Sequence, residues 1–237
     1  MVQKIKILRL HDTIYYNNKN TKKTKESFKF LYNIIDKKKI NSNTKILDVG
    51  CGDGNLIYYL NKKLPKVSIT AIDVDDKILS IVRNNTSKNN KIIKYDINKK
   101  DQKIIGKFDI IVAAGVMAIF DDPNIFFKNI FNNLKKNGCL YLFGNFTDYP
   151  FNIFIKYEDI KKLKGVHQSG FNVYSTQYLK KKFPRKKITT YPFFINKKIK
   201  KNNKDLIRSW TENHNGKKYF INALGFYQNQ MWLKINN

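Results

Sequence analysis

Apolar and polar positions follow two rhythms along the middle of the chain. Largely apolar runs at 67–72, 108–114 and 139–143 alternate with stretches in which apolar residues recur every three or four positions. A short continuous run predicts a buried strand, and the longer repeat predicts an amphipathic helix. Strands and helices that alternate in this way predict an α/β fold whose doubly wound, mostly parallel sheet is covered by helices on both faces.

The same pattern bounds the individual elements. A first amphipathic helix is expected over residues 24–39, ahead of a strand that contains Ile46, Leu47 and Val49. The following strands are predicted at 67–72, 91–95, 108–114 and 139–143, and the helices between them at 75–84 and 122–136. The pair Asn137-Gly138 should end the second of these helices, because both residue types favour helix termination.

The rhythm changes after Gly144. A short helix is predicted at 175–183, and strands are predicted at 188–195, 219–224 and 231–235. Two of these late strands lie close together without a clear crossover helix. They therefore predict an antiparallel hairpin at the edge of the sheet.

A glycine-rich stretch, KILDVGCGDGNLIYYL at 45–60, organises the rest of the chain. The first strand runs into Gly50, Gly52 and Gly54, and a helical pattern resumes at Leu56. Glycines let the backbone approach a ligand closely, and the amide groups at a helix N-terminus favour a negative group. This loop predicts a binding site for a ligand with an anionic end.

Polar residues at the ends of the next strands refine this prediction. Asp73 and Asp96 end the second and third strands, and Ala114-Gly115 ends the fourth. Doubly wound sheets bind ligands at the carboxyl ends of their strands, so these positions should face one cleft. Asp73 follows the glycine loop by about 20 residues, the spacing at which a carboxylate accepts hydrogen bonds from ribose hydroxyls. A nicotinamide cofactor would also satisfy these features.

Two carboxylates favour a different ligand. Asp48 lies inside the first strand, just before Gly50, where it would repel a pyrophosphate but suits an ammonium group or a bound water. Asp96 is placed to accept a hydrogen bond from the exocyclic amine of adenine. A ligand with an amino acid at one end and an adenosine at the other meets both demands, which changes the expected end group from a plain anion to a zwitterion.

The formal net charge of +28 suggests polyanionic partners such as nucleic acid. However, the chain contains 42 lysines and only four arginines, Arg9, Arg83, Arg185 and Arg208. Surfaces that read phosphates usually enrich arginine for its bidentate geometry. The lysine excess therefore favours a composition set by a low-GC genome, and a nucleic-acid partner stays open without being preferred.

Cysteine usage and hydropathy indicate a cytoplasmic protein. Cys51 and Cys139 are too few for a disulfide framework and lie far from any histidine cluster that would predict a metal site. The N-terminal residues lack the apolar core of a signal peptide, and the longest apolar run, 108–120, is too short to span a membrane. We therefore expect no metal and no membrane insertion, and the oligomeric state is not predicted.

Five motifs, DVGCGDG, AIDVDD, YDI, FDIIVAAGVMAIFDDP and LKKNGCLYLFG, resemble in order and spacing those of class I S-adenosylmethionine-dependent methyltransferases. The resemblance covers about 44–144. It implies a Rossmann-like sheet of seven strands with an antiparallel hairpin at one edge, and S-adenosyl-L-methionine as cofactor. The residues that it implies for the cofactor pocket are Asp48, Gly50, Cys51, Gly52, Asp73, Val74, Asp96 and Ile97, with Ala114 and Gly115 near the sulfonium.

This resemblance divides the single domain, 1–237, into three parts. Residues 1–43 would form an N-terminal helical cap, 44–145 the cofactor-binding core, and 146–237 an acceptor-binding elaboration with the edge hairpin. Where relatives carry a Glu-His or His-His pair in the fourth motif, this chain has Ala118-Ile119. Any catalytic base must therefore come from elsewhere in the chain.

The candidates for binding the acceptor or moving its proton lie in the last third of the chain. They are His167 in GVHQSGFN, and Arg208 and His214 in LIRSWTENHNG. Arg208 is the best candidate for an anion clamp, because arginine is sparse here, although a structural salt bridge is the alternative. Glu158 and Glu212 are weaker candidates for a base.

A second, looser resemblance joins GVHQSGFNVYST, RSWT and FINALGF to small-molecule methyltransferases encoded among bacterial surface-polysaccharide genes. It favours O-methylation of a small anionic metabolite, such as a nucleotide-linked sugar or a phosphoryl or phosphoramidate-type precursor of capsule or lipopolysaccharide. Two alternatives stay open. One is an RNA or protein methyltransferase that docks through its basic surface, and the other is a non-catalytic cofactor-binding module.

Overall fold

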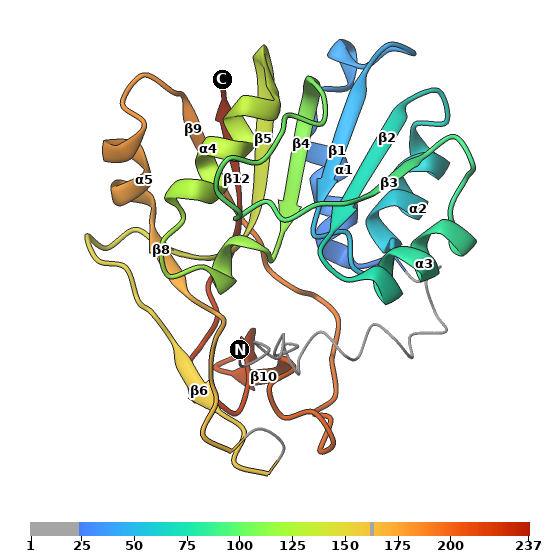
Figure 1. The fold of residues 1–237 in the computed structure, drawn as a ribbon. Helices are drawn as coiled ribbons and strands as arrows, with labels where there is room; N and C mark the ends of the chain where they lie inside the picture. Colours follow the sequence, from blue (N-terminus) through green and yellow to red (C-terminus); the bar gives the residue numbers. More distant parts are fainter. Residues whose placement is uncertain (1–23, 162–163) are drawn as a thin grey trace, which may run out of the picture.

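The computed structural model describes residues 24–161 and 164–237 (Figure 1). Its main sheet has eight strands in this part of the chain, and seven of them follow the order β3-β2-β1-β4-β5-β12-β9. The parallel strands are β1 (Lys45–Val49), β2 (Ser68–Asp73), β3 (Lys91–Lys94), β4 (Phe108–Ala114) and β5 (Leu134–Thr147). The predicted doubly wound, mostly parallel sheet is confirmed.

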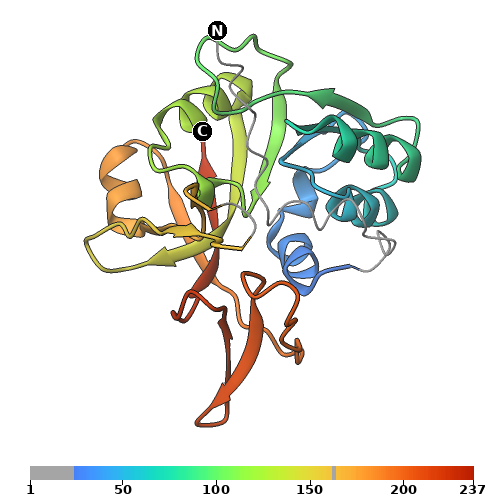
Figure 2. The same cartoon turned by 60° about the horizontal axis from the view of Figure 1, so that its bottom comes forward.

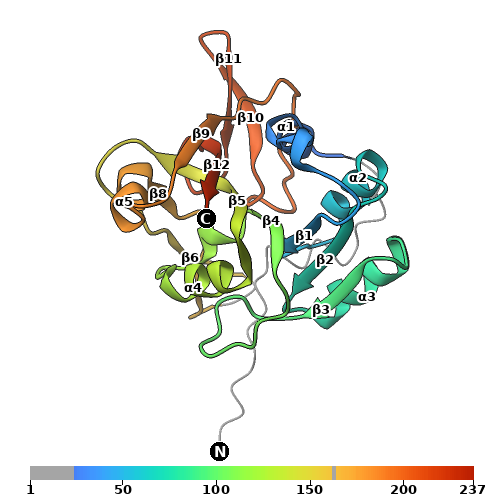
Figure 3. The ribbon, with the colours of Figure 1, turned by 90° about the horizontal axis from the view of Figure 1, so that it is seen from above.

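Helices cover the sheet on both faces (Figure 3). One face carries α1 (Glu26–Ile34), α2 (Asn55–Lys63) and α3 (Asp76–Asn85), whose apolar residues share one core with Ile46 and Trp232. The other face carries α4 (Asn124–Asn133) and α5 (Thr176–Lys182), which pack on Leu47 and Leu142. Burial of this continuous apolar surface is the main term that holds the three layers together.

The antiparallel part of the sheet lies at its C-terminal side, as predicted. β12 (Gln230–Asn236) pairs antiparallel with both β5 and β9 (Ile188–Pro192), and β9 forms the edge. A further hairpin, β10 (Trp210–His214) and β11 (Lys217–Ile221), is inserted in the chain between β9 and β12. The strand predicted at 219–224 is therefore β11, and it pairs with β10 rather than with the main sheet.

Three short strands lie in the region whose sequence showed no clear period. β6 (Lys156–Glu158) pairs antiparallel with β7 (His167–Ser169), and β8 (Val173–Ser175) adds to the end of β5 in parallel. The pair β6–β7 and the hairpin β10–β11 both lie beyond the carboxyl ends of the parallel strands (Figure 1). The part of the chain after Gly144 thus extends over the side of the sheet where a ligand is expected.

Two predicted helices are shorter than expected. α1 ends at Ile34, and a separate 3-10 turn, η2 (Lys37–Lys39), follows it. α4 ends at Asn133, because Leu134 already pairs with Phe108 and the register then shifts between Phe108 and Ile110. The residues predicted to end this helix, Asn137-Gly138, therefore lie in the irregular first part of β5.

Local capping explains where two other helices begin. The Asp75 side chain accepts hydrogen bonds from the backbone amides of Lys77 and Ile78 at the start of α3, at 2.8 and 3.2 Å. The Ser175 hydroxyl accepts one from the Tyr178 amide at the start of α5. Such caps satisfy amide groups that have no partner within the helix, and they place both starts within one residue of the predicted positions.

Candidate cofactor-binding site

The glycine loop between β1 and α2 is held close to β2. The amides of Gly50 and Cys51 both donate hydrogen bonds to the carbonyl oxygen of Ile72, at 2.9 and 3.0 Å. Gly50 has a φ of +65°, and a Cβ atom added to it would lie 2.4 Å from Cγ2 of Val116. Only glycine fits here, because both the backbone conformation and the space exclude a side chain.

Asp73, at the end of β2, is oriented by three backbone amides. Its Oδ2 accepts a hydrogen bond from Gly52 at 3.2 Å, and its Oδ1 accepts from Val74 and Asp75 at 2.8 and 3.2 Å. The predicted ribose-binding carboxylate is therefore joined to the glycine loop, with Val74 41% exposed beside it. Each carboxylate oxygen can accept more than one hydrogen bond, so this arrangement leaves acceptor capacity for a ligand.

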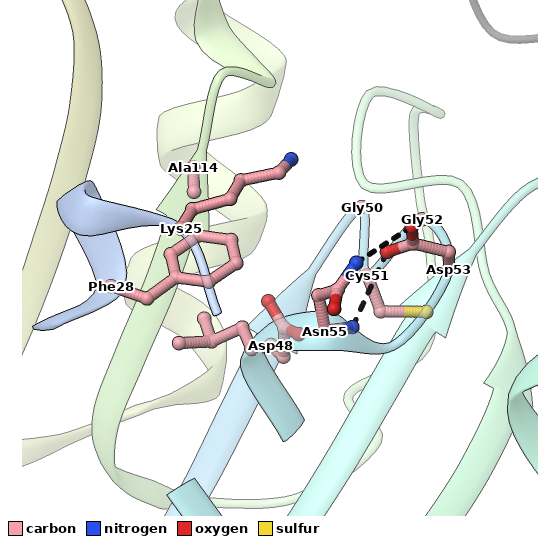
Figure 4. Close-up of a pocket in the computed structure, with 10 residues that line it drawn as sticks. Lys25, Phe28, Asp48, Gly50, Cys51, Gly52, Asp53, Asn55 and Ala114 are labelled. Atoms are coloured by element: carbon pink, nitrogen blue, oxygen red, sulfur yellow. Dashed lines mark hydrogen bonds between the residues drawn. The ribbon is translucent and has the colours of Figure 1, made fainter. Parts of the chain in front are cut away.

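A hollow of about 330 Å³, part of it open to solvent, lies in front of the glycine loop (Figure 4). The predicted residues that line it are Asp48, Gly50, Cys51, Gly52 and Ala114. It is also lined by residues that the sequence analysis did not single out, namely Lys25, Phe28, Asp53, Asn55 and Leu56. The structure thus brings part of α1 to the site predicted at the first strand.

Asp48 is the most unusual side chain of this hollow. It is 2% exposed, and within the described residues its Oδ2 has no hydrogen-bond partner. Burial raises the pKa of this carboxyl to about 7, with a further rise from the neighbouring Asp73, while Lys25 opposes the shift. A buried carboxylate oxygen without a partner is costly, so a cationic or hydrogen-bond-donating ligand group would stabilise it.

Asp53 and Asn55 form a buried pair at the start of α2. The side-chain amide of Asn55 donates to Asp53 Oδ2 at 2.7 Å, and its backbone amide donates to Oδ1 at 3.3 Å. Both residues lie in the turn that the glycines create, and this polar Asp-x-Asn spacing was the available signal for them.

Burial and nearby carboxylates raise the pKa of the Cys51 thiol well above its usual range, so Cys51 lines the hollow as a neutral side chain.

The residues predicted at the ends of the third and fourth strands lie with the glycine loop at the carboxyl ends of the parallel strands. Asp96 is exposed and accepts a hydrogen bond from the Asn98 amide at 2.9 Å, whereas Ile97 is buried. The carbonyl oxygen of Ile97 accepts from the Asn129 side chain of α4 at 2.9 Å. Gly115 is exposed with a φ of +83°, and its amide is bonded to the Phe143 carbonyl oxygen.

The two histidines predicted for the acceptor lie on two separate hairpins, and Arg208 lies ahead of one of them. His167 is exposed on β7, and His214 is exposed at the end of β10, in the hairpin that projects beyond the sheet in Figure 2. Arg208 precedes β10 and forms an ion pair with Asp205, with Nε 3.3 Å from Oδ2. The salt bridge weighed as the alternative role of Arg208 is therefore present, and an anion would compete with Asp205 for it.

Glu158 and Glu212 both have hydrogen-bond donors in the structure. Oε1 of Glu158 accepts from the Gly165 amide at 2.6 Å, and Oε1 of Glu212 accepts from the indole N–H of Trp210 at 2.8 Å. One oxygen of each carboxylate is therefore already bonded within the protein.

Hydrogen bonds of Asn172 link the segment around β6 and β7 to the loop that follows β4. Its side chain donates to the Phe120 carbonyl oxygen and to Asp121 Oδ1, both at 3.0 Å, and accepts from the Ile155 amide at 2.8 Å. Asp121 also accepts from the Ser169 hydroxyl. The elaboration after β5 is thus joined to the strand end where the sulfonium is expected.

Residues 40–144 match the family model described as "Methyltransferase domain". This part of the chain is a methyltransferase domain. It contains the glycine loop, Asp48, Asp73 and Asp96, and S-adenosyl-L-methionine is the cofactor of such domains. One feature of the structure fits that cofactor, namely the unpartnered buried oxygen of Asp48, which an ammonium group would stabilise.

Among curated proteins, the chain is similar to two malonyl-[acyl-carrier protein] O-methyltransferases. It is 32% identical over 123 residues to that of Halalkalibacterium halodurans and 29% identical over 120 residues to that of Priestia megaterium. Each match covers 49% of this chain, and the matches cover 45% and 43% of the two relatives. The chain therefore matches less than half the length of these relatives.

Among solved structures, the fold is similar to coclaurine N-methyltransferase bound to N-methylheliamine and SAH. The TM-score is 0.56 at 15% identity, over 81% of this chain and 60% of that enzyme. At this identity the likeness concerns the fold alone, which agrees with the strand order described above. Neither this structure nor the two curated relatives supports the looser resemblance to polysaccharide enzymes.

Two further findings concern the described residues only. No group of three or more histidine, cysteine, aspartate or glutamate side chains there is arranged to hold a metal ion. No helix in 24–161 or 164–237 has the length and apolar character needed to cross a membrane.

Proposed function

We propose that the whole chain is an S-adenosylmethionine-dependent methyltransferase that modifies an anionic oxygen of a small or carrier-linked acid. The observation that carries this proposal is the hollow of the methyltransferase domain, where the buried Asp48 carboxyl and the Asp73-bound glycine loop stand side by side. The O-methyltransferase relatives support oxygen as the acceptor atom, and their printed substrate, a malonyl group on a carrier, is an acid.

The roles of the chain's own residues follow from their positions. Asp48 would hold the ammonium group of the methionine moiety, Asp73 the ribose hydroxyls and Asp96 the adenine amine. When bound, the cofactor supplies a methyl group that passes from sulfonium sulfur to the acceptor oxygen, while the sulfur keeps the electron pair of the broken bond. The protein contributes chiefly by holding the acceptor oxygen in line, an effect of up to roughly 7–11 kcal/mol in well-oriented systems.

An anionic acceptor suits a site without a strong base. A carboxylate or phosphate oxygen carries no proton that has to be removed, whereas a hydroxyl acceptor gains about 10²–10⁴-fold from a general base. Ala118-Ile119 supply no such base in the fourth motif, and Glu158 and Glu212 are already hydrogen-bonded. His167, Arg208 and His214 are proposed to bind the acceptor, with Arg208 as an anion clamp.

The direct test is a screen for S-adenosylhomocysteine release. Malonyl-loaded acyl carrier protein, free dicarboxylic acids, nucleotide-linked sugars and phosphorylated metabolites serve as acceptors, and Asp73→Ala serves as the inactive control. We expect turnover with at least one acid, and none with the same molecule as its methyl ester or amide. Turnover only with neutral hydroxyl or amine acceptors would refute the anionic-oxygen proposal.

The charge of +28 supports one competing function, methylation of RNA. In that case binding should fall steeply with salt, because every phosphate that is neutralised releases counterions. We therefore include total RNA in the screen at low and at moderate salt. Methylated RNA, without turnover of any small acid, would favour this alternative. Tight cofactor binding without turnover of any acceptor would favour a non-catalytic module.

A further inference from the structure

Lys25 brings a positive charge to the mouth of the cofactor hollow. It immediately precedes α1, is exposed, and lines the hollow together with Phe28, with its Nζ 5.3 Å from the centre of the Phe28 ring (Figure 4). Among the described residues that line the hollow, Lys25 is the only cation. It is also close enough to Asp48 to act on the carboxyl's ionisation.

The position of Lys25 is set by how α1 packs. Phe28 and Leu31 are buried against the sheet, and the indole N–H of Trp232 on β12 donates to the Ser27 carbonyl oxygen at 3.2 Å. Glu26 Oε2 accepts a hydrogen bond from the Asn196 amide at 3.3 Å. Because α1 is anchored on both sides, its first residues are held over the glycine loop.

The charges around the hollow are arranged for a zwitterion. Asp48 and Asp53 lie inside it and Asp73 lies behind the loop, so its interior is negative. An amino-acid group carries an ammonium and a carboxylate within a few ångströms of each other. If Asp48 receives the ammonium group, the carboxylate needs a cationic partner on the open side, and that side is where Lys25 lies.

We propose that Lys25 binds the carboxylate of the cofactor's methionine moiety, so that α1 is part of the cofactor site. This inference rests on the proposed function, because it requires an amino-acid-bearing cofactor in the hollow. A charge-assisted hydrogen bond from a lysine is stronger than a neutral one, although solvent exposure weakens it. The competing arrangement has the carboxylate held by the backbone amides at the start of α2 alone.

The test compares two ligands by isothermal titration calorimetry on the full chain. S-adenosylhomocysteine has the amino-acid group, whereas 5′-methylthioadenosine keeps the adenosine and the thioether but lacks it. We expect Lys25→Ala to weaken binding of S-adenosylhomocysteine by about tenfold and to leave binding of 5′-methylthioadenosine unchanged. Lys25→Arg should restore most of the loss.

Lys29→Ala is the matched control, because Lys29 is exposed on the same helix, carries the same charge and does not line the hollow. It should bind both ligands as the wild type does. Equal loss in Lys25→Ala and Lys29→Ala would indicate a general charge effect and overturn the proposal. Unchanged binding of S-adenosylhomocysteine by Lys25→Ala would overturn the assignment of Lys25 alone. Failure of the wild type to bind S-adenosylhomocysteine would instead overturn the proposed function together with it.

Discussion

The backbone amide of Gly52 donates a hydrogen bond to Asp73 Oδ2 over 3.2 Å, so two motifs that lie 21 residues apart form one unit. With the amides of Val74 and Asp75 on Oδ1, this carboxylate stabilises the glycine loop and the turn after β2. The residue proposed to bind ribose therefore also shapes the loop in front of it. Loss of its side chain should affect folding as well as binding.

We expect Asp73→Ala to lower both cofactor affinity and stability. Loss of three backbone hydrogen bonds to one carboxylate should cost about 1–3 kcal/mol of unfolding free energy. Loss of the ribose partner should weaken S-adenosylhomocysteine binding at least about tenfold. Urea unfolding and calorimetry measure the two effects. Asp76→Ala, which removes an exposed carboxylate paired with Lys94, is the control and should change neither. Wild-type affinity in Asp73→Ala would contradict the ribose assignment.

Asp48→Asn should stabilise the cofactor-free protein above pH 7. The folded-state pKa of about 7 lies above the ordinary value of 3.8, so between these values the folded state binds more protons than the unfolded state. The wild type therefore loses stability as the pH rises from about 4 to 7, by at most roughly 4 kcal/mol. The variant lacks this loss. Thermal unfolding at pH 4.5 and pH 8 measures the stability difference between Asp48→Asn and the wild type. The same difference at both pH values would contradict the prediction.

Cofactor affinity should depend on the ionisation of the same carboxyl. A bound ammonium group favours ionised Asp48, so binding at pH 6 releases a proton and affinity rises with pH. Below the pKa of about 7, the affinity of the wild type should fall by up to about tenfold per pH unit. Asp48→Asn should bind more weakly and show a flatter profile between pH 5 and 8. Calorimetry in buffers of different ionisation enthalpy counts the protons, and no proton release at pH 6 would argue against an ammonium partner.

Gly50→Ala should destabilise the protein far more than Gly225→Ala, although both glycines have a positive φ. Gly50 and Gly225 have φ values of +65° and +81°, but only at Gly50 does an added Cβ collide, at 2.4 Å from Val116 Cγ2. The variant at 225 should lose about 1 kcal/mol from backbone strain, and the variant at 50 about 1–3 kcal/mol more from overpacking. The midpoints of urea unfolding compare the stabilities of the two variants. Similar losses of stability would show that Val116 can move aside.

Arg208→Ala and Asp205→Ala together separate the two roles of the arginine. If Arg208 clamps an anionic acceptor, its loss should raise the KM for that acceptor about tenfold, whereas Asp205→Ala should not raise it. If the pair is only structural, Arg208→Ala should lose under about 1 kcal/mol of stability and keep the wild-type KM. Asp205→Ala should lose more stability than Arg208→Ala, because Asp205 Oδ1 also accepts a hydrogen bond from the Arg208 backbone amide at 3.3 Å. Steady-state kinetics with the first acid found in the screen decides between the two roles.

Local sequence was sufficient for the core of the fold. The largely apolar run at 108–114 coincides with β4, and the predicted helix at 75–84 differs from α3 by one residue at each end. These elements depend on side-chain periodicity and on capping by near neighbours such as Asp75. Such signals are complete within a few residues, so they can be interpreted without knowledge of the fold.

The boundary between α4 and β5 depended on distant residues. Local sequence predicts a helix that continues to residue 136, yet Leu134 pairs with Phe108 and the Lys135 ammonium binds both oxygens of Asp109, at 2.8 and 2.9 Å. Likewise, the residues at 219–224 predict a strand but do not identify the strand with which it pairs. Strand pairing is decided by contacts across the chain, and for this reason β11 could not be assigned to β10 in advance.

The sequence by itself determined the cofactor loop, because glycine spacing and the carboxylates Asp48 and Asp73 are local properties of strand ends. Only the tertiary structure brought Lys25 and Phe28 to that loop, since α1 is placed by the bond from Trp232 to Ser27, residues 205 positions apart. Burial likewise raised the pKa of Asp48, because desolvation depends on every element packed around a side chain and not on its neighbours in sequence.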